Sequence, residues 1–204
     1  MAGTMPHAIF VETGLDGGAT VAAYAAELPG CATFAATDDE ATNAMPRRVE
    51  TFTAWLRQQG QAAPTFVGDN WYEVERAAVT DAGEGQRAAF TLDELPLSDD
   101  EFREYLSWLE LAREELAAAL DAAEGGPTDP LEQISRQDEQ FVRELGGAGD
   151  EPGAGPIDRL YASRALLTDA LVAAGTNHDA VRRVIRIAIA DDLRLAEALR
   201  GVMG

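Results

Sequence analysis

The stretch from Val21 to Ala44 limits the possible folds more than any other part of the chain. It contains two short strand patterns joined by a tight corner at residues 28–31, and a helix start follows directly. Adjacent Pro and Gly residues in the corner indicate a turn. Thr37 and Glu40 form the T-x-x-E pattern of a capping box, which satisfies backbone N–H groups at the first turn of a helix. This stretch therefore predicts two neighbouring strands and a helix that packs near them.

The residues on either side extend this pattern into a small sheet module. His7–Thr13 alternates its side chains as a strand does, and Asp16–Gly18 provides a hairpin turn before the strand from Val21. After Pro64, the segments 66–67 and 71–79 are rich in β-branched and aromatic residues. We expect the strand and helix order βββαβ.

The helix that begins at Thr37 carries apolar residues at helical spacing, and Gly60 is placed to end it. Pro46 lies inside this helix. A proline in a helix interior removes one hydrogen bond and costs about 3 kcal/mol. We therefore expect a kink or break near Met45.

The second half changes to the period of amphipathic helices. Ser98 and Glu101 form another capping box, and Asp129-Pro130 places a proline at the first position of a helix. Four helices are expected, approximately over 98–124, 129–145, 157–174 and 176–202. Short connections favour an up-and-down four-helix bundle. The predicted fold class is α+β, with a βββαβ module at 1–88 and an all-α bundle at 89–204.

The charge of the chain restricts its partners. The sequence has 16 basic residues, all of them arginine, against 36 acidic residues, which gives a net charge of −20. Nucleic-acid binding needs clustered cations, so direct binding of DNA or RNA is disfavoured. The excess of acidic residues has two explanations. It gives the protein a well-solvated surface, suited to a salty cytoplasm, or it makes the surface complementary in charge to a basic partner protein. No apolar run reaches the ~20 residues of a membrane span and no signal-peptide pattern is present, so we expect a cytoplasmic protein without membrane contact.

The strand pair, the corner "ELPGC", the third strand and the capped helix "T-x-x-E-A" together resemble the HicB antitoxin module over residues 7 to 79. The resemblance implies a protein partner, a small basic RNA-cleaving toxin of the HicA type, and it makes a homodimer plausible. The DNA-binding segment that many HicB antitoxins carry after this module has no counterpart here. The corner residues that carry the motif are the candidates for partner binding: Leu28, Pro29, Gly30 and Cys31. Cys31 is expected to be a small buried side chain, with a reactive thiol as the alternative.

The second half resembles the DinB-like helical bundle, most clearly over "LPLSDDEFREYLSWLELAREELAAAL". Such bundles hold a divalent metal with three histidines, whereas this chain contains only His7 and His178. The positions that match the histidine triad are Gln133, Asp191 and Leu195. We therefore expect no metal and no cofactor. The alternative is a residual metal site at Gln133, Asp191 and Asp192; otherwise these aspartates are solvated or paired with Arg186 or Arg194.

Three functions follow as hypotheses. The first is a non-catalytic interaction or regulatory protein whose HicB-like module recognises a protein partner. The second is a metal-dependent thiol transferase or hydrolase of the DinB-like class, which rests on fold analogy. The third is a protein that binds a small molecule in the bundle core, beside residues such as Trp108, Phe141 and Tyr161.

Overall fold

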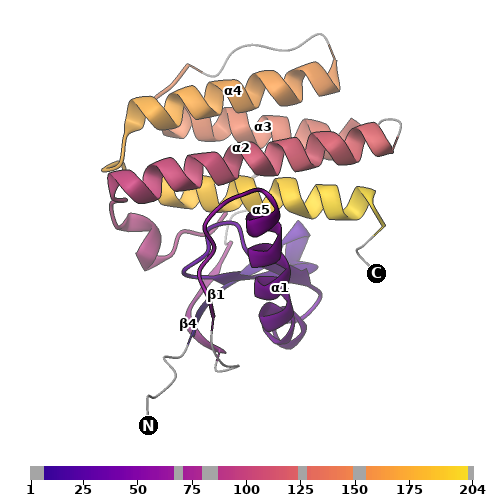
Figure 1. The fold of residues 1–204 in the computed structure, drawn as a ribbon, viewed down its shortest axis with the longest axis vertical. Helices are drawn as coiled ribbons and strands as arrows, with labels where there is room; N and C mark the ends of the chain where they lie inside the picture. The colour runs from indigo at the N-terminus through magenta and orange to yellow at the C-terminus, as the bar shows by residue number, and fades with distance from the viewer. Residues whose placement is uncertain (1–6, 67–70, 80–86, 124–127, 149–154, 202–204) are drawn as a thin grey trace. The chain divides into compact units, whose positions relative to one another are not determined.

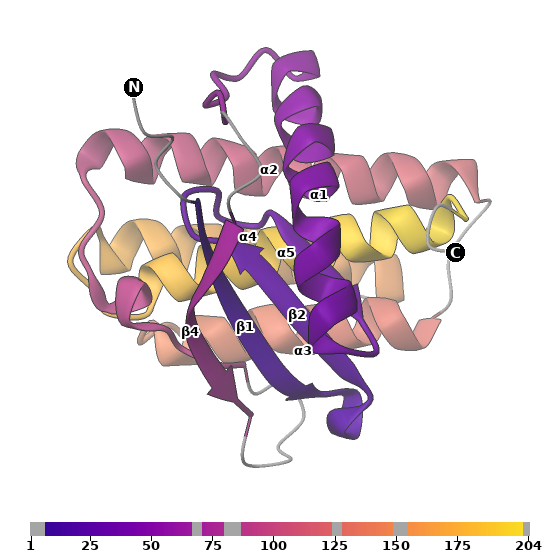
Figure 2. The same cartoon turned by 90° about the horizontal axis from the view of Figure 1, so that it is seen from below.

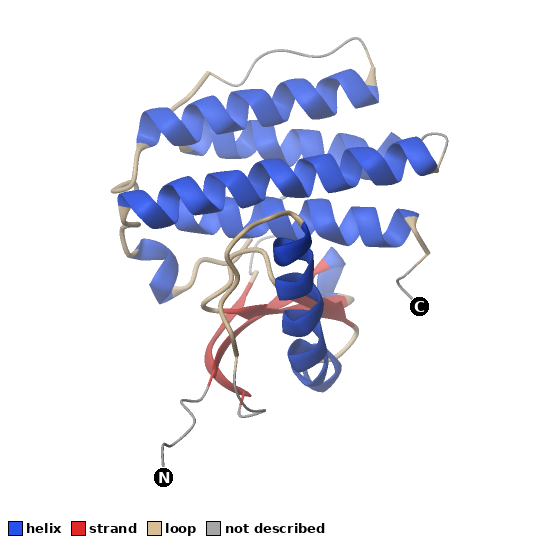
Figure 3. Cartoon of the chain, viewed as in Figure 1, coloured by secondary structure: helices blue, strands red, loops and turns tan. Residues whose placement is uncertain are grey.

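The fold is α+β, as predicted: a four-stranded sheet with one helix comes first, and a set of long helices follows (Figure 3). The structure is a computed structural model that describes residues 7–66, 71–79, 87–123, 128–148 and 155–201. Contacts divide the chain into two compact units, Met1–Leu92 and Asp93–Gly204. The division falls four residues after the predicted boundary at residue 88.

The sheet of the first unit has the order β3-β2-β1-β4. Its strands are β1 (His7–Leu15), β2 (Thr20–Ala25), β3 (Ala32–Ala35) and β4 (Trp71–Ala78). The first three strands form an antiparallel meander, whereas β4 pairs in parallel with β1 (Figure 2). The helix α1 (Asp38–Gln58) lies between β3 and β4 in the sequence, which makes the crossover that a parallel pair requires. The predicted order βββαβ is therefore confirmed; the expected strand residue Val67 lies outside the described residues.

The two faces of this sheet bury different side chains. Val11, Ala23 and Thr33 are cross-strand neighbours, and the Thr33 hydroxyl donates a 2.7 Å hydrogen bond to the Ala41 carbonyl of α1. The face that carries these residues is therefore covered by α1, whose buried residues recur at helical spacing. The opposite face carries Phe10 and Tyr24, which pack against Phe90 of the segment that follows β4.

The predicted break in α1 is wrong. The helix is continuous from Asp38 to Gln58 and contains Pro46 in its interior. The Thr37 side chain accepts a hydrogen bond from the Glu40 N–H, so the predicted cap is present. Burial of Met45, Val49 and Phe52 against the sheet explains why the helix persists, because it outweighs the one hydrogen bond that Pro46 removes.

The second unit is a four-helix bundle whose helices lie side by side with similar axes (Figure 1). They are α2 (Asp99–Ala122), α3 (Thr128–Glu144), α4 (Pro156–Ala174) and α5 (Val181–Leu199). α2 packs mainly on α5, α3 packs on α4, and α3 also contacts α5. α5 begins at Val181, five residues later than the predicted start at residue 176. Among the described residues, no helix combines the length and the apolar character needed to cross a membrane.

A ring of ion pairs in the bundle core

The core of the bundle contains four charged side chains, one from each helix. They are Arg113 of α2, Asp138 of α3, Arg164 of α4 and Asp192 of α5. All four are buried, and Asp192 has no exposed surface. Burial of a charge is costly unless the charge is paired and hydrogen-bonded, so the contacts among these residues decide whether the arrangement is tolerable. We call these four residues the core ring.

Arg113 and Asp192 form a bidentate pair. Arg113 Nε lies 3.0 Å from Asp192 Oδ2, and its Nη2 lies 3.0 Å from Oδ1. The Arg113 Nη1 atom donates a further 2.6 Å hydrogen bond to the Leu160 carbonyl of α4. The fork of a guanidinium matches the two oxygens of a carboxylate, which gives this pair both strength and a fixed geometry.

Asp138 and Arg164 close the ring. Arg164 Nε and Nη2 each lie 3.2 Å from an oxygen of Asp138, and Nη2 also lies 3.1 Å from Asp192 Oδ2. Arg113 Nη2 contacts Asp138 at 3.1 Å. Each aspartate therefore bridges both arginines, and the four helices are tied by one neutral set of two positive and two negative charges.

The opposite charges of the ring stabilise one another in their ionised forms. Burial alone would lower the pKa of Arg113, but the charges of Asp192 and Asp138 outweigh this effect and raise the pKa above its ordinary value. Arginine is in any case cationic at every accessible pH. Both aspartates therefore lie beside two permanent positive charges, and their oxygens accept hydrogen bonds from the two arginines.

The hypothesis that Asp191 or Asp192 pairs with Arg186 or Arg194 is wrong for Asp192, whose partners are Arg113 and Arg164. Arg186 instead forms a bidentate pair with Asp93, at 3.2 and 2.6 Å. Both of these residues are buried as well. This second pair holds the residues before α2 against α5. The Leu97 N–H donates a 3.0 Å bond to the carbonyl of Thr176, which lies in the connection between α4 and α5.

The three positions that match the histidine triad do not share one environment. Gln133 is exposed on α3, and Leu195 packs against the apolar cluster around Leu116 and Leu160. Asp191 alone lines a recess beside the core ring. Within the described part of the chain, no group of three or more His, Cys, Asp or Glu side chains has the arrangement of a metal site.

The recess lies between α3, α4 and α5. Its polar wall is formed by Gln137, Asp138, Arg164 and Asp191, and Phe141 contributes to its apolar wall. Of the aromatic residues predicted to line a pocket in the core, Phe141 does so and Trp108 is buried on α2. Tyr161 was predicted to point inward, but it is 48% exposed, because the inward positions of α4 are those of Leu160, Arg164 and Leu167.

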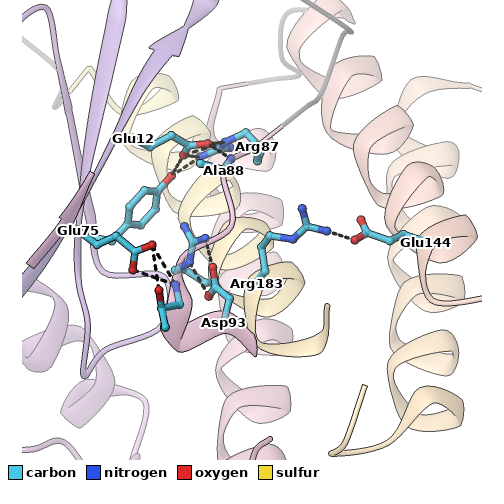
Figure 4. A network of polar contacts seen from close by, with 10 residues as sticks. Glu12, Glu75, Arg87, Ala88, Asp93, Glu144 and Arg183 are labelled. Carbon is cyan, nitrogen blue, oxygen red and sulfur yellow. Dashed lines mark hydrogen bonds and ion pairs between the residues drawn. The ribbon is translucent and has the colours of Figure 1, made fainter. Parts of the chain in front are cut away.

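The sheet unit has its own buried carboxylate at Glu12 of β1 (Figure 4). Glu12 accepts a 2.8 Å hydrogen bond from the Tyr24 hydroxyl, and its Oε2 lies 3.1 Å from Arg87 Nη2. The Ala88 N–H also donates to Glu12, at 2.5 Å. Arg87 and Ala88 begin the segment that leads to Phe90. Glu12 therefore holds this segment against the face of the sheet that α1 does not cover.

The corner residues proposed for partner binding have a structural role. Leu28, Pro29, Gly30 and Cys31 are all buried. The corner is closed by the Cys31 N–H, which donates a 2.9 Å bond to the Leu28 carbonyl, and Gly30 has φ +87°, which favours glycine. Because these side chains are buried, they offer no surface to a partner. Cys31 is a small buried side chain, as expected.

The exposed feature of the sheet unit is β4, which forms one edge of the sheet. Tyr72 and Val74 are 46% and 51% exposed, the two large exposed apolar side chains of this strand. A change of register between Ile9 and Phe10 of β1 leaves Val74 as an extra residue in β4, a β-bulge. Glu75 beside it is held by Thr91, whose N–H and hydroxyl both donate to its carboxylate (Figure 4).

Comparisons of this chain with protein-family models, with curated proteins and with solved structures give no match.

The core ring was missed by the sequence analysis, although a signal was present. Arg113, Asp138 and Arg164 each lie four residues after and three residues before a buried apolar residue of the same helix. Asp192 likewise lies four residues from the buried Ala188 and Ala196. A charged residue in the apolar stripe of a helix indicates a buried partner, and two such residues of each sign indicate a closed set.

Proposed function

We propose that the sheet unit is a non-catalytic recognition module of the HicB antitoxin type, and that it binds a basic protein partner, a toxin of the HicA type. The observation that carries this proposal is the edge strand β4, with two large apolar side chains exposed on a strongly acidic chain. Sheet edges with exposed apolar residues are common sites of partner binding.

The sign of the charge favours a basic partner over a second copy of the chain. Residues 1–92 contain 12 acidic and 5 basic residues, and the whole chain carries −20. Two copies of this chain would repel each other at low salt, whereas a basic protein would be attracted and its association accelerated. An RNA-cleaving toxin needs a basic surface for its substrate, and an acidic module can mask that surface.

The aromatic and apolar residues of β4 form the surface that we propose as the binding site. Tyr72 and Val74 supply apolar area that charge attraction alone lacks, and tyrosine is enriched among residues that dominate binding energy. The Arg76 guanidinium is engaged by Glu73 and by Asp38 of α1, so the positive charge on this strand is neutralised.

The experiment is a binding titration of the full chain against a purified HicA-type toxin with an inactivated catalytic residue. We expect saturable binding that weakens as salt rises, because exposed charges more than about 10 Å apart are screened at 0.1 M salt. The double variant Tyr72→Ser with Val74→Ser should lose at least about tenfold in affinity. The matched control is Val172→Ser, an exposed valine of α4. Absence of binding, or equal loss in both variants, contradicts the proposal.

A further inference from the structure

The helix α4 carries apolar residues on an exposed side as well as on its buried side. Ile157, Tyr161 and Val172 are 44%, 48% and 59% exposed, and Ala165 is exposed as well. Together with the half-buried Thr168, they recur every three or four residues from the first turn of the helix to the last. We call these five residues the α4 stripe. Single exposed apolar residues are normal, whereas a continuous line of them along one side of a helix is typical of a contact surface.

Four residues of the α4 stripe have the spacing of a coiled-coil seam. Tyr161, Ala165, Thr168 and Val172 follow one another at steps of four, three and four residues, which is the alternation of the d and a positions of a heptad. The exposed positions of α2 and α3 are, by contrast, mostly polar or charged. The seam is therefore a feature of α4, and its spacing suits another helix as the partner.

The charge of α4 favours a partner without net charge at the contact. The helix contains two acidic and two basic residues, whereas α2 contains eight acidic and two basic ones. Both arginines of α4 are engaged, Arg159 with Glu139 of α3 at 2.8 Å and Arg164 in the core ring. The charge of α4 therefore attracts neither a basic nor an acidic protein. A neutral apolar helix face fits this surface, and a second copy of the chain presents one.

The order of residues along the stripe suits an antiparallel contact with itself. A two-fold axis midway between Ala165 and Thr168 would place Tyr161 of one copy beside Val172 of the other. The two small residues at the centre would then meet each other and allow the helices to approach closely. A parallel contact would instead place Asp158, one heptad before Ala165, against Asp158 of the second copy, and like charges repel. We propose that the α4 stripe binds the α4 stripe of a second copy of the chain in antiparallel orientation.

The dimer should be weak and should strengthen with salt. A single helix contact buries less than the ~800 Å² per partner of a standard interface, so we expect half-association on the order of 10–100 µM. Two chains of charge −20 repel each other, and salt screens this repulsion. The salt dependence is thus opposite to that of toxin binding at β4. Toxin titrations at concentrations below this range involve the monomer, so substitutions on the stripe leave them unchanged.

The test is sedimentation equilibrium of the full chain at low and high salt. Ala165→Glu buries a charge at the centre of the contact, so it should weaken dimerisation at least about tenfold at both salt concentrations. The matched control is Ala118→Glu at an exposed position of α2, which adds the same charge to the chain and should dimerise nearly as the unmodified protein does. Circular dichroism checks that both variants keep their helices.

Disulfide cross-linking tests the orientation. With copper-phenanthroline as the oxidant, a mixture of Tyr161→Cys and Val172→Cys chains should form a disulfide between the two variants faster than either variant does with itself. Cys31 is buried, so the unmodified chain gives the background rate. The proposal is overturned if the chain stays monomeric in high salt well above the expected concentration range, or if Ala165→Glu dimerises as tightly as Ala118→Glu. It is also overturned if each cysteine variant cross-links with itself as fast as the mixture does.

Discussion

Arg113 and Asp192 face each other across the contact between α2 and α5, joined by two hydrogen bonds of 3.0 Å. They lie 79 positions apart in the sequence, and together with Asp138 and Arg164 they connect all four helices of the bundle. We expect this set of buried charges to specify how the helices align, because another alignment would leave a charge without its partner.

Removal of one member of the ring should be strongly destabilising. Asp192→Asn leaves Arg113 and Arg164 with one carboxylate between them, and an uncompensated buried charge costs about 3–5 kcal/mol. The measurement is urea denaturation of the full chain followed by circular dichroism. Asp169→Asn on the exposed face of α4 is the control and should change the free energy of unfolding by less than about 0.5 kcal/mol. A change below 1 kcal/mol for Asp192→Asn would contradict the ring geometry.

Replacement of the whole ring by apolar residues should cost less than the single substitution. The variant with Arg113→Met, Asp138→Leu, Arg164→Met and Asp192→Leu removes all four desolvation penalties together, and such replacements are often neutral or stabilising by about 1–4 kcal/mol. The same denaturation experiment compares it with Asp192→Asn. If the fourfold variant were less stable than the single variant, the ring would be a net source of stability rather than of specificity.

Glu12 should have a comparable role in the sheet unit. Glu12→Gln removes the charge that faces the buried Arg87, so we expect a loss of about 3 kcal/mol and faster hydrogen exchange at the Ala88 N–H. Glu27→Gln, which is exposed, is the matched control. Equal exchange rates at Ala88 in both variants would show that Glu12 does not hold this segment.

Pro46 offers a stabilising substitution. In the continuous helix α1 a proline leaves one backbone carbonyl without its helical donor, so Pro46→Ala should raise the free energy of unfolding by about 1–3 kcal/mol. Thermal denaturation measures this change. Arg47→Ala at the next, exposed position should have little effect. A loss of stability in Pro46→Ala would indicate that the proline ring itself contributes to packing.

The pH dependence of the α2 cap has a definite sign. The Ser98 N–H and hydroxyl hydrogen-bond the Glu101 carboxylate and hold its pKa below the ordinary value. A lowered pKa in the folded state contributes stability above the ordinary carboxyl pKa of about 4.3, and this contribution is lost as the pH falls through the lowered value. Ser98→Ala should raise the Glu101 pKa in an NMR titration and cost about 1 kcal/mol at neutral pH. An unchanged Glu101 pKa would contradict the capping box.

The helix caps, the turn and the buried faces of the helices could be predicted because each depends on residues that are close together in the sequence. The caps at Thr37 and Ser98, the turn at Gly30 and the apolar stripes follow from neighbouring residues. The persistence of α1 through Pro46 could not be predicted, since it depends on packing against β2 and β3. Partners such as Arg87 for Glu12 lie 75 positions away, and no local pattern identifies which arginine meets which carboxylate.

The central claim is that the chain acts by binding a basic toxin. The most direct measurement is the rate at which a purified HicA-type toxin cleaves RNA while increasing amounts of the full chain are added. We predict that cleavage falls in proportion to the added chain until a fixed stoichiometry is reached, and that Tyr72→Ser with Val74→Ser shifts this titration to higher concentration. An unchanged cleavage rate at a large excess of the chain, for toxins shown to be active and soluble, would contradict the account.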